Sequence, residues 1–146
     1  MSPNFSQLRK LVLRCGSVFY GHIAGITSSE PHYIILLNDK PITDDSFVLV
    51  VASSRVERVG FLRRQFGANT IAEIELGTED FLPKPTYINC NDVKLLEVKY
   101  IKEKYDCRQL KCLDSSMSEG NLKQIISCVR NSRVVSEEKK NLLPKN

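Results

Sequence analysis

Three observations predict a mainly β, α+β fold: a small antiparallel barrel with one helix at its C-terminal end. Turn-forming residues cut the first two thirds of the chain into short apolar runs, which is typical of a barrel of short strands. Helical periodicity follows after residue 118. The length of 146 residues, with 42% hydrophobic and 26% charged residues, suits one domain with a buried core.

The first expected strand covers residues 17–26, which are rich in β-branched and aromatic side chains. Gly21 and Gly25 lie inside this run and indicate a bulge or a close approach by another backbone segment. A polar loop over residues 28–31 follows. The continuous apolar run of residues 32–37 predicts a second strand, which we expect to be buried on both faces.

Residues 47–52 repeat that apolar pattern as a third strand, and we expect the second and third strands to form the core. Residues 71–76 alternate in polarity as a half-exposed strand. Prolines in the next connection exclude a central strand there. Two further short strands are expected over residues 86–90 and 93–98.

The apolar spacing of residues 118–131 predicts an amphipathic helix that packs on the barrel. Residues 102–114 fit the end of a strand or a loop, and the pattern does not choose between them. We expect one domain over residues 1–131, followed by a charged tail over residues 132–146. This tail is short of apolar residues, so we expect it to be loose, with about one helical turn.

Composition and motifs exclude several classes of protein. No apolar run approaches the roughly 20 residues that cross a bilayer, and no signal-peptide pattern is present. Five cysteines without a C-x-x-C pair are typical of free thiols in a reducing compartment. Phosphate-binding glycine loops and metalloprotease motifs are missing. We therefore expect a cytoplasmic protein with no membrane association, metal or cofactor. The net charge of +4 permits an anionic partner without requiring one.

Three side chains at the ends of predicted strands are candidate catalytic residues. His32 begins the second strand just after a loop, where a side chain is held rigidly and still reaches a ligand. An ordinary surface or core histidine is the alternative, and it is the stronger interpretation for His22 in mid-strand. Ser53 and Ser54 end the third strand directly before Arg55, an arrangement that suits a phosphate, although an ordinary polar turn is also common.

Four arginines lie close together in the connection that follows the third strand, with two phenylalanines among them. Guanidinium groups pair with phosphates and aromatic rings stack on bases, so this composition suits single-stranded RNA. A hairpin whose charges face water is the alternative. The arginines are Arg55, Arg58, Arg63 and Arg64, and the phenylalanines are Phe61 and Phe66.

The order of these segments resembles the PemK/MazF family of toxin ribonucleases over about residues 15–131. The resemblance implies a curled, SH3-like barrel that forms a homodimer and cleaves single-stranded RNA without a metal, by transesterification through the 2′-hydroxyl. It also implies an antitoxin protein as a partner. The segments that carry it are residues 16–20, 32–38, 50–54, 86–90 and 120–132.

Individual positions of the chain agree with that family to different degrees. Ser53 and Ser54 match a pair of hydroxyl residues, whereas His32 stands where members usually carry an arginine. Asn89 and Asn91 stand where the best-studied branch has an arginine and an aspartate. An amide carries no charge and exchanges no proton at neutral pH.

Three functions therefore stay open at the level of the sequence. In a divergent endoribonuclease, His32 acts as acid or base, Ser53 and Ser54 hold the phosphate, and an arginine clamps it. In a catalytically inactive module, the same barrel binds RNA or a protein. A purely structural dimer would have neither activity nor ligand.

Overall fold

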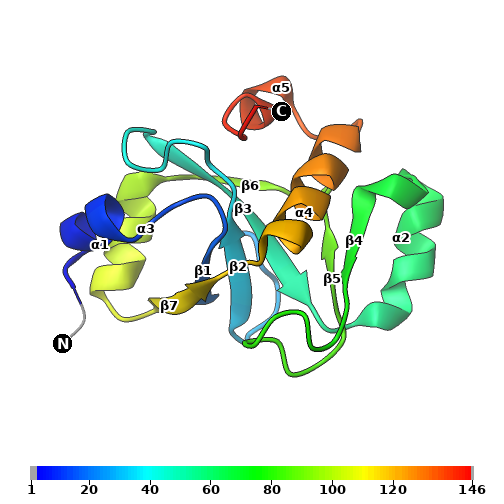
Figure 1. The fold of residues 1–146 in the computed structure, drawn as a ribbon, viewed down its shortest axis with the longest axis horizontal. Helices are drawn as coiled ribbons and strands as arrows, with labels where there is room; N and C mark the ends of the chain where they lie inside the picture. Colours follow the sequence, from blue (N-terminus) through cyan, green and yellow to red (C-terminus); the bar gives the residue numbers. More distant parts are fainter. Residues whose placement is uncertain (1–2, 146) are drawn as a thin grey trace.

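The computed structural model describes residues 3–145, in which helices pack on a seven-stranded antiparallel sheet (Figure 1). The strands are β1 (Ser17–Gly21), β2 (His32–Leu36), β3 (Ser46–Ser53), β4 (Ile71–Ile74), β5 (Thr86–Asn89), β6 (Lys94–Glu97) and β7 (Leu110–Ser116). The α-helices are α1 (Phe5–Leu11), α2 (Val59–Phe66), α3 (Val98–Asp106), α4 (Glu119–Asn131) and α5 (Glu137–Lys140). Two short 3₁₀ turns, Val56–Arg58 and Ala68–Thr70, flank α2. The α+β class expected from the sequence is confirmed.

Strand β3 organises the sheet because it pairs along both of its edges. One edge pairs with β2, and the other pairs with β6 in its first half and with β5 in its second half. The strand order is β4-β5-β3-β2-β1-β7, with β6 beside β3. Within the described residues β4 and β7 each pair on one side, so the sheet is open. The small barrel expected from the sequence is therefore not closed, because within residues 3–145 β4 and β7 at the two edges of the sheet do not pair with each other.

Alternate residues of β2 and β3 enter two different hydrophobic cores. Ile35 and Val50 pack in one core with Ile125 and Val129 of α4. The neighbouring positions, such as Ile34 and Leu49, enter the other core, which contains residues of α1 and α3. Figure 1 shows α1 and α3 together at one end of the sheet and α4 in front of its middle. Burial of the second predicted strand on both faces is thus confirmed.

The structure supplies helices that the sequence analysis did not predict. Helix α1 begins at the Asn4 N-cap, whose side chain accepts a hydrogen bond from the Gln7 backbone N–H while the Gln7 side chain returns one. This reciprocal capping box is readable in a sequence. Of residues 102–114, for which the sequence predicts a strand end or a loop, the first part belongs to α3, residues 107–109 form a turn, and the remainder belongs to β7.

The C-terminal segment packs against the domain, so the expectation of a loose tail over residues 132–146 is wrong for its described part. Val135 and Leu143 are buried in the same core as α4. The Lys140 ammonium donates to the Ser132 carbonyl at 2.6 Å, and the Arg130 guanidinium donates to the Pro144 carbonyl. The expected helical turn is present as α5. Apolar side chains and hydrogen bonds together hold this charged segment against the core.

The helices of residues 3–145 are too short or too polar to cross a bilayer.

Gly21 is required by a close approach of two backbones, as its position in the sequence indicated. A Cβ atom at Gly21 would lie 2.0 Å from the Gln109 carbonyl oxygen. We expect Gly21→Ala to lower the free energy of unfolding by about 1–3 kcal/mol, because backbone atoms must move apart. Gly120 is the matched control, since a Cβ there meets no atom within 4 Å in helix α4. Gly120→Ala should raise stability by up to about 1 kcal/mol. Urea unfolding measures both, and equal effects at the two glycines would contradict the structure.

Candidate functional site

A groove opens where β2 begins and β3 ends. Ile34 pairs with Val51 in these antiparallel strands, so extending the register by two residues puts His32 opposite Ser53. On the other side of β3, Ser53 lies opposite Tyr87 of β5. Residues directly opposite one another in an antiparallel sheet project from the same face. His32, Ser53 and Tyr87 therefore form one row across the sheet.

The groove has two adjoining lobes with four lining residues in common: Ser28, His32, Ser53 and Arg55. The first lobe has a volume of about 530 Å³ and the second a volume of about 250 Å³. Further side chains of the first lobe include Tyr20, Tyr33, Ser54, Leu82, Pro83 and Lys84. Those of the second include Arg58, Tyr87, Asn89, Asp92 and Lys94.

A hydrogen bond to the backbone determines which ring nitrogen of His32 carries the proton. Its Nδ1 atom lies 2.9 Å from the carbonyl oxygen of Glu30, which only accepts hydrogen bonds, so Nδ1 carries the proton and donates it. In the neutral ring the lone pair is then on Nε2. No group of residues 3–145 hydrogen-bonds to Nε2. The half-buried imidazole can therefore accept a proton from a ligand in the groove.

Ser53 and Ser54 both line the first lobe, so the structure brings the three candidate catalytic residues together. The Ser53 hydroxyl oxygen accepts a hydrogen bond from the Arg55 backbone N–H at 3.2 Å, and its own proton can point to a ligand. Ser54 follows the last residue of β3 and is exposed. Their roles in binding or catalysis stay predictions.

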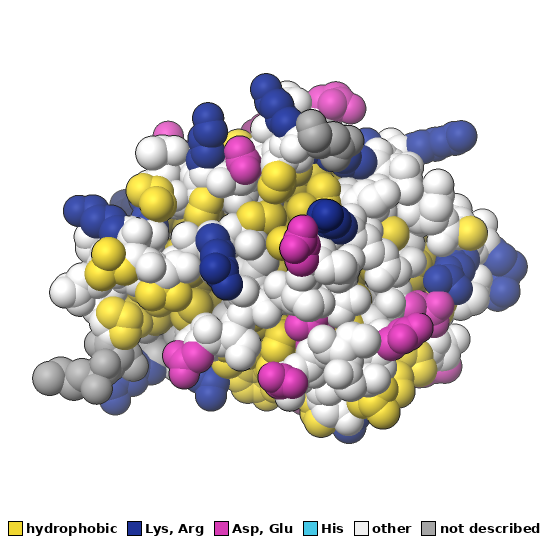
Figure 2. Space-filling model, viewed as in Figure 1, with side chains coloured by type: hydrophobic (Ala, Val, Ile, Leu, Met, Phe, Trp, Pro, Cys, Tyr) yellow, Lys and Arg dark blue, Asp and Glu magenta, His cyan; other side chains and the backbone are white. Residues whose placement is uncertain are grey.

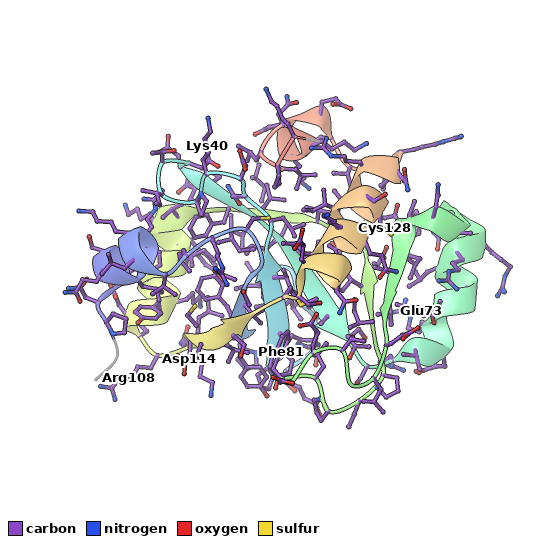
Figure 3. The ribbon with its side chains drawn as sticks, viewed as in Figure 1. Lys40, Glu73, Phe81, Arg108, Asp114 and Cys128 are labelled. Carbon is purple, nitrogen blue, oxygen red and sulfur yellow. The ribbon has the colours of Figure 1, made fainter. Side chains whose placement is uncertain are left out.

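The structure separates the four candidate arginines into two groups. Arg55 and Arg58 line the groove, whereas Arg63 and Arg64 on α2 do not. The Arg63 guanidinium pairs with the Glu73 carboxylate at 2.8 Å, and Figure 3 shows Glu73 on β4 beside α2. Within the described residues, Arg55 and Arg58 are therefore the only expected RNA-binding arginines that have access to the groove.

The segment expected to be a basic hairpin is helical, because its apolar side chains recur at helical spacing. Val59, Leu62 and Phe66 of α2 pack on Ile71 and Tyr87 of the sheet. Phe66 is thereby partly buried against the sheet and does not line the groove, while Phe61 is 54% exposed. The interleaving of arginine and phenylalanine thus reflects an amphipathic helix rather than one continuous binding strip.

The sequence analysis did not identify Lys84, Lys94, Tyr20 or Tyr33 as candidate residues of the groove. Lys94 is only 16% exposed, and its ammonium donates to the Gly25 carbonyl at 3.0 Å and to the Asp92 carboxylate at 2.9 Å. These bonds fix the β1–β2 loop over the second lobe. Tyr20 pairs directly with Tyr33 in the β1–β2 register. Because Tyr33 is the neighbour of His32 in β2, the two tyrosines project from the sheet face opposite to the His32–Ser53 row, and only the lining of the first lobe shows that they border the groove at the strand ends.

The amides at positions 89 and 91 have different environments. Asn91 donates to the Thr70 hydroxyl and to the Asn89 side-chain oxygen, each at 2.9 Å, and accepts from the Ser132 hydroxyl at 2.7 Å. It therefore ties the end of β5 to the end of α4, outside the groove. Asn89 lines the second lobe.

The cysteine thiols lie away from the groove. Burial and the nearby Asp39 carboxylate raise the pKa of Cys15 to about 11, and burial with Asp114 raises the pKa of Cys112 to about 11. A hydrogen bond that Cys90 donates lowers the pKa of Cys128 on α4, and the charge of Arg63 adds to this. Figure 3 shows Cys128 on the side of α4 that faces β4. Within residues 3–145 no cysteine lines either lobe.

Charge on the molecule is mixed rather than concentrated. On the face that carries α4, Lys and Arg side chains are interspersed with Asp and Glu (Figure 2). In the part of the chain that the structure describes, no group of three or more His, Cys, Asp or Glu residues is arranged to hold a metal ion. Comparison with models of known protein families and with curated proteins finds no match to this chain.

The hydrogen bonds of Asn91 predict a structural role. Asn91→Ala leaves the buried Ser132 hydroxyl without its acceptor, so we expect a loss of about 1–3 kcal/mol in the free energy of unfolding. Asn141→Ala, at an exposed position, is the control and should change stability by less than about 0.5 kcal/mol. Thermal and urea unfolding check both. Unchanged stability of Asn91→Ala would show that this network does not support the fold.

Proposed function

We propose that this chain is a divergent PemK/MazF-like toxin, a metal-independent endoribonuclease that cleaves single-stranded RNA through the 2′-hydroxyl. The observation that supports this most is the His32–Ser53 row at the groove, with Arg55 in both lobes. An imidazole with a free Nε2, a hydroxyl and a cation are the groups that activate an alcohol and hold a phosphodiester. The resemblance in segment order adds a homodimer, an antitoxin partner and a cytoplasmic setting to this proposal.

The proposed reaction follows from the positions of these groups. His32 Nε2 removes the proton from the 2′-hydroxyl, and the resulting oxygen attacks the adjacent phosphorus. The bond from phosphorus to the 5′-oxygen breaks, and that oxygen takes a proton from water in the open groove. Arg55 and the hydroxyls of Ser53 and Ser54 stabilise the charge on the phosphoryl oxygens. The products are a 2′,3′-cyclic phosphate and a 5′-hydroxyl.

A second candidate function is an inactive module that binds RNA or a protein. The observation that favours it is Asn89 in the second lobe, together with Asn91 in a structural network. Neither amide can exchange a proton at neutral pH. Binding, in contrast, requires only the cations and aromatic rings that the groove contains.

Cleavage assays distinguish the two functions. We expect the purified protein to cut a mixed RNA pool in excess EDTA, and His32→Ala to lower the rate by at least about 100-fold, the usual scale for a general base. The control is His22→Ala, which removes the other, exposed histidine and should leave the rate unchanged. End-group analysis of the fragments should find 2′,3′-cyclic phosphates. No cleavage between pH 6 and 8 would exclude the nuclease and leave the binding module.

Binding assays test the RNA contact separately from cleavage. A 2′-O-methyl RNA oligonucleotide cannot undergo the reaction, so its dissociation constant can be measured over a range of salt concentrations. We expect Arg55→Ala and Arg58→Ala each to reduce the slope of log affinity against log salt by about 0.7, the contribution of one phosphate contact on a single strand. Arg133→Ala, an exposed arginine outside the groove, should not change the slope. Affinity independent of salt would exclude RNA as the ligand.

A further inference from the structure

The first lobe contains an aromatic wall, Tyr20 and Tyr33, that the proposed reaction does not use. The two residues pair directly across β1 and β2, and their ring centroids are 4.6 Å apart. Phe81 packs against Tyr33, with 5.3 Å between the ring centroids, and Figure 3 shows it near the start of β2. Both tyrosines are half-buried and both line the lobe. Their positions are therefore held by packing while part of each ring stays accessible.

A second part of the lining of the first lobe is also apolar and anchored. Leu82 and Pro83 line it from the connection between β4 and β5. Glu79, in the same connection, is buried and accepts hydrogen bonds from the Ser118 N–H at 3.0 Å and from its hydroxyl at 2.6 Å. A carboxylate at the start of α4 is also favoured by the helix dipole. The first lobe, called the slot below, thus has anchored apolar lining residues from β1, β2 and the β4–β5 connection.

Two lysines lie close to this slot. The Lys111 ammonium stands 5.7 Å from the centroid of the Tyr20 ring, and Lys84 lines the lobe beside Pro83. Arg55 and Ser53 connect the slot to the second lobe. A flat, neutral group in the slot would therefore have cations close by that can pair with phosphates of the same strand. The volume of about 530 Å³ lies in the range of small-molecule sites.

We propose that Tyr20 and Tyr33 form a base-stacking surface, on which the nucleobase beside the phosphate held by Ser53 and Arg55 packs. The inference deepens the proposed function and rests on it, because it names where a base of single-stranded RNA binds. Every base has a π-face, so such a surface gives affinity with little sequence preference. Lys84 and Lys111 pair with the flanking phosphates. Tyr20 and Tyr33 contact the substrate in this arrangement and take no part in the chemical step.

An abasic scan of a 2′-O-methyl RNA octamer tests this inference without cleavage. Removing one base at a time should weaken binding by about 5- to 150-fold at one or two adjacent positions, the loss expected when stacking disappears. Tyr20→Leu and Tyr33→Leu keep apolar volume behind the slot but remove the π-face, so each should weaken binding of the intact octamer by a similar factor. Tyr20→Phe and Tyr33→Phe should restore it. Thermal unfolding of each variant verifies the fold.

The combined measurements separate stacking from a structural role. In an octamer abasic at the critical position, the leucine variants should bind as well as the unsubstituted protein. If they weaken the abasic and intact octamers equally, or if no abasic position matters, the stacking surface is overturned. Salt-dependent binding through Arg55 would then still support the proposed function. Failure to bind or cleave any RNA would overturn both proposals.

Discussion

Burial of β2 and β3 on both faces is the constraint on which the rest of the structure depends. Ile34 and Ile35 are each 1% exposed, although they are adjacent and point to opposite faces. Helices α1 and α3 cover one face and α4 covers the other, so apolar burial stabilises the central positions of these strands on both faces. A polar side chain can be accommodated only where the strands leave the cores, and His32 and Ser53 stand at those ends.

Antiparallel pairing of β2 and β3 then brings one end of each strand to the same site. The start of β2 and the end of β3 necessarily meet, because neighbouring strands run in opposite directions. Two loops complete the groove, and each is anchored by a charged side chain with few exposed atoms. Lys94 holds the β1–β2 loop through the Gly25 carbonyl, and Glu79 holds the β4–β5 connection through Ser118. Preorganisation of this kind reduces the entropy lost on ligand binding.

In this molecule the charge available at the groove depends on individual ion pairs and on the packing of α2, rather than on the net charge. The excess of +4 is small, and charges of both signs share the face in Figure 2. Helix α2 turns Arg63 toward Glu73, whereas Arg55 precedes the helix and remains at the groove. A cluster of arginines in the sequence therefore divides into a structural member and groove-lining members. The division follows from the apolar face of α2, which packs on Ile71 and Tyr87.

The sequence by itself determined the strands near residues 32–37 and 47–52, the helix near 118–131 and the α+β class, because periodicity and turn chemistry act within a few residues. It also placed His32 and Ser53 at strand ends. Only the tertiary structure decided that the sheet stays open, that Val135 and Leu143 bring the last segment to the core, and that Tyr20 and Tyr33 border the groove. These features depend on contacts between residues far apart in the chain, and local patterns do not determine which distant segments pack together.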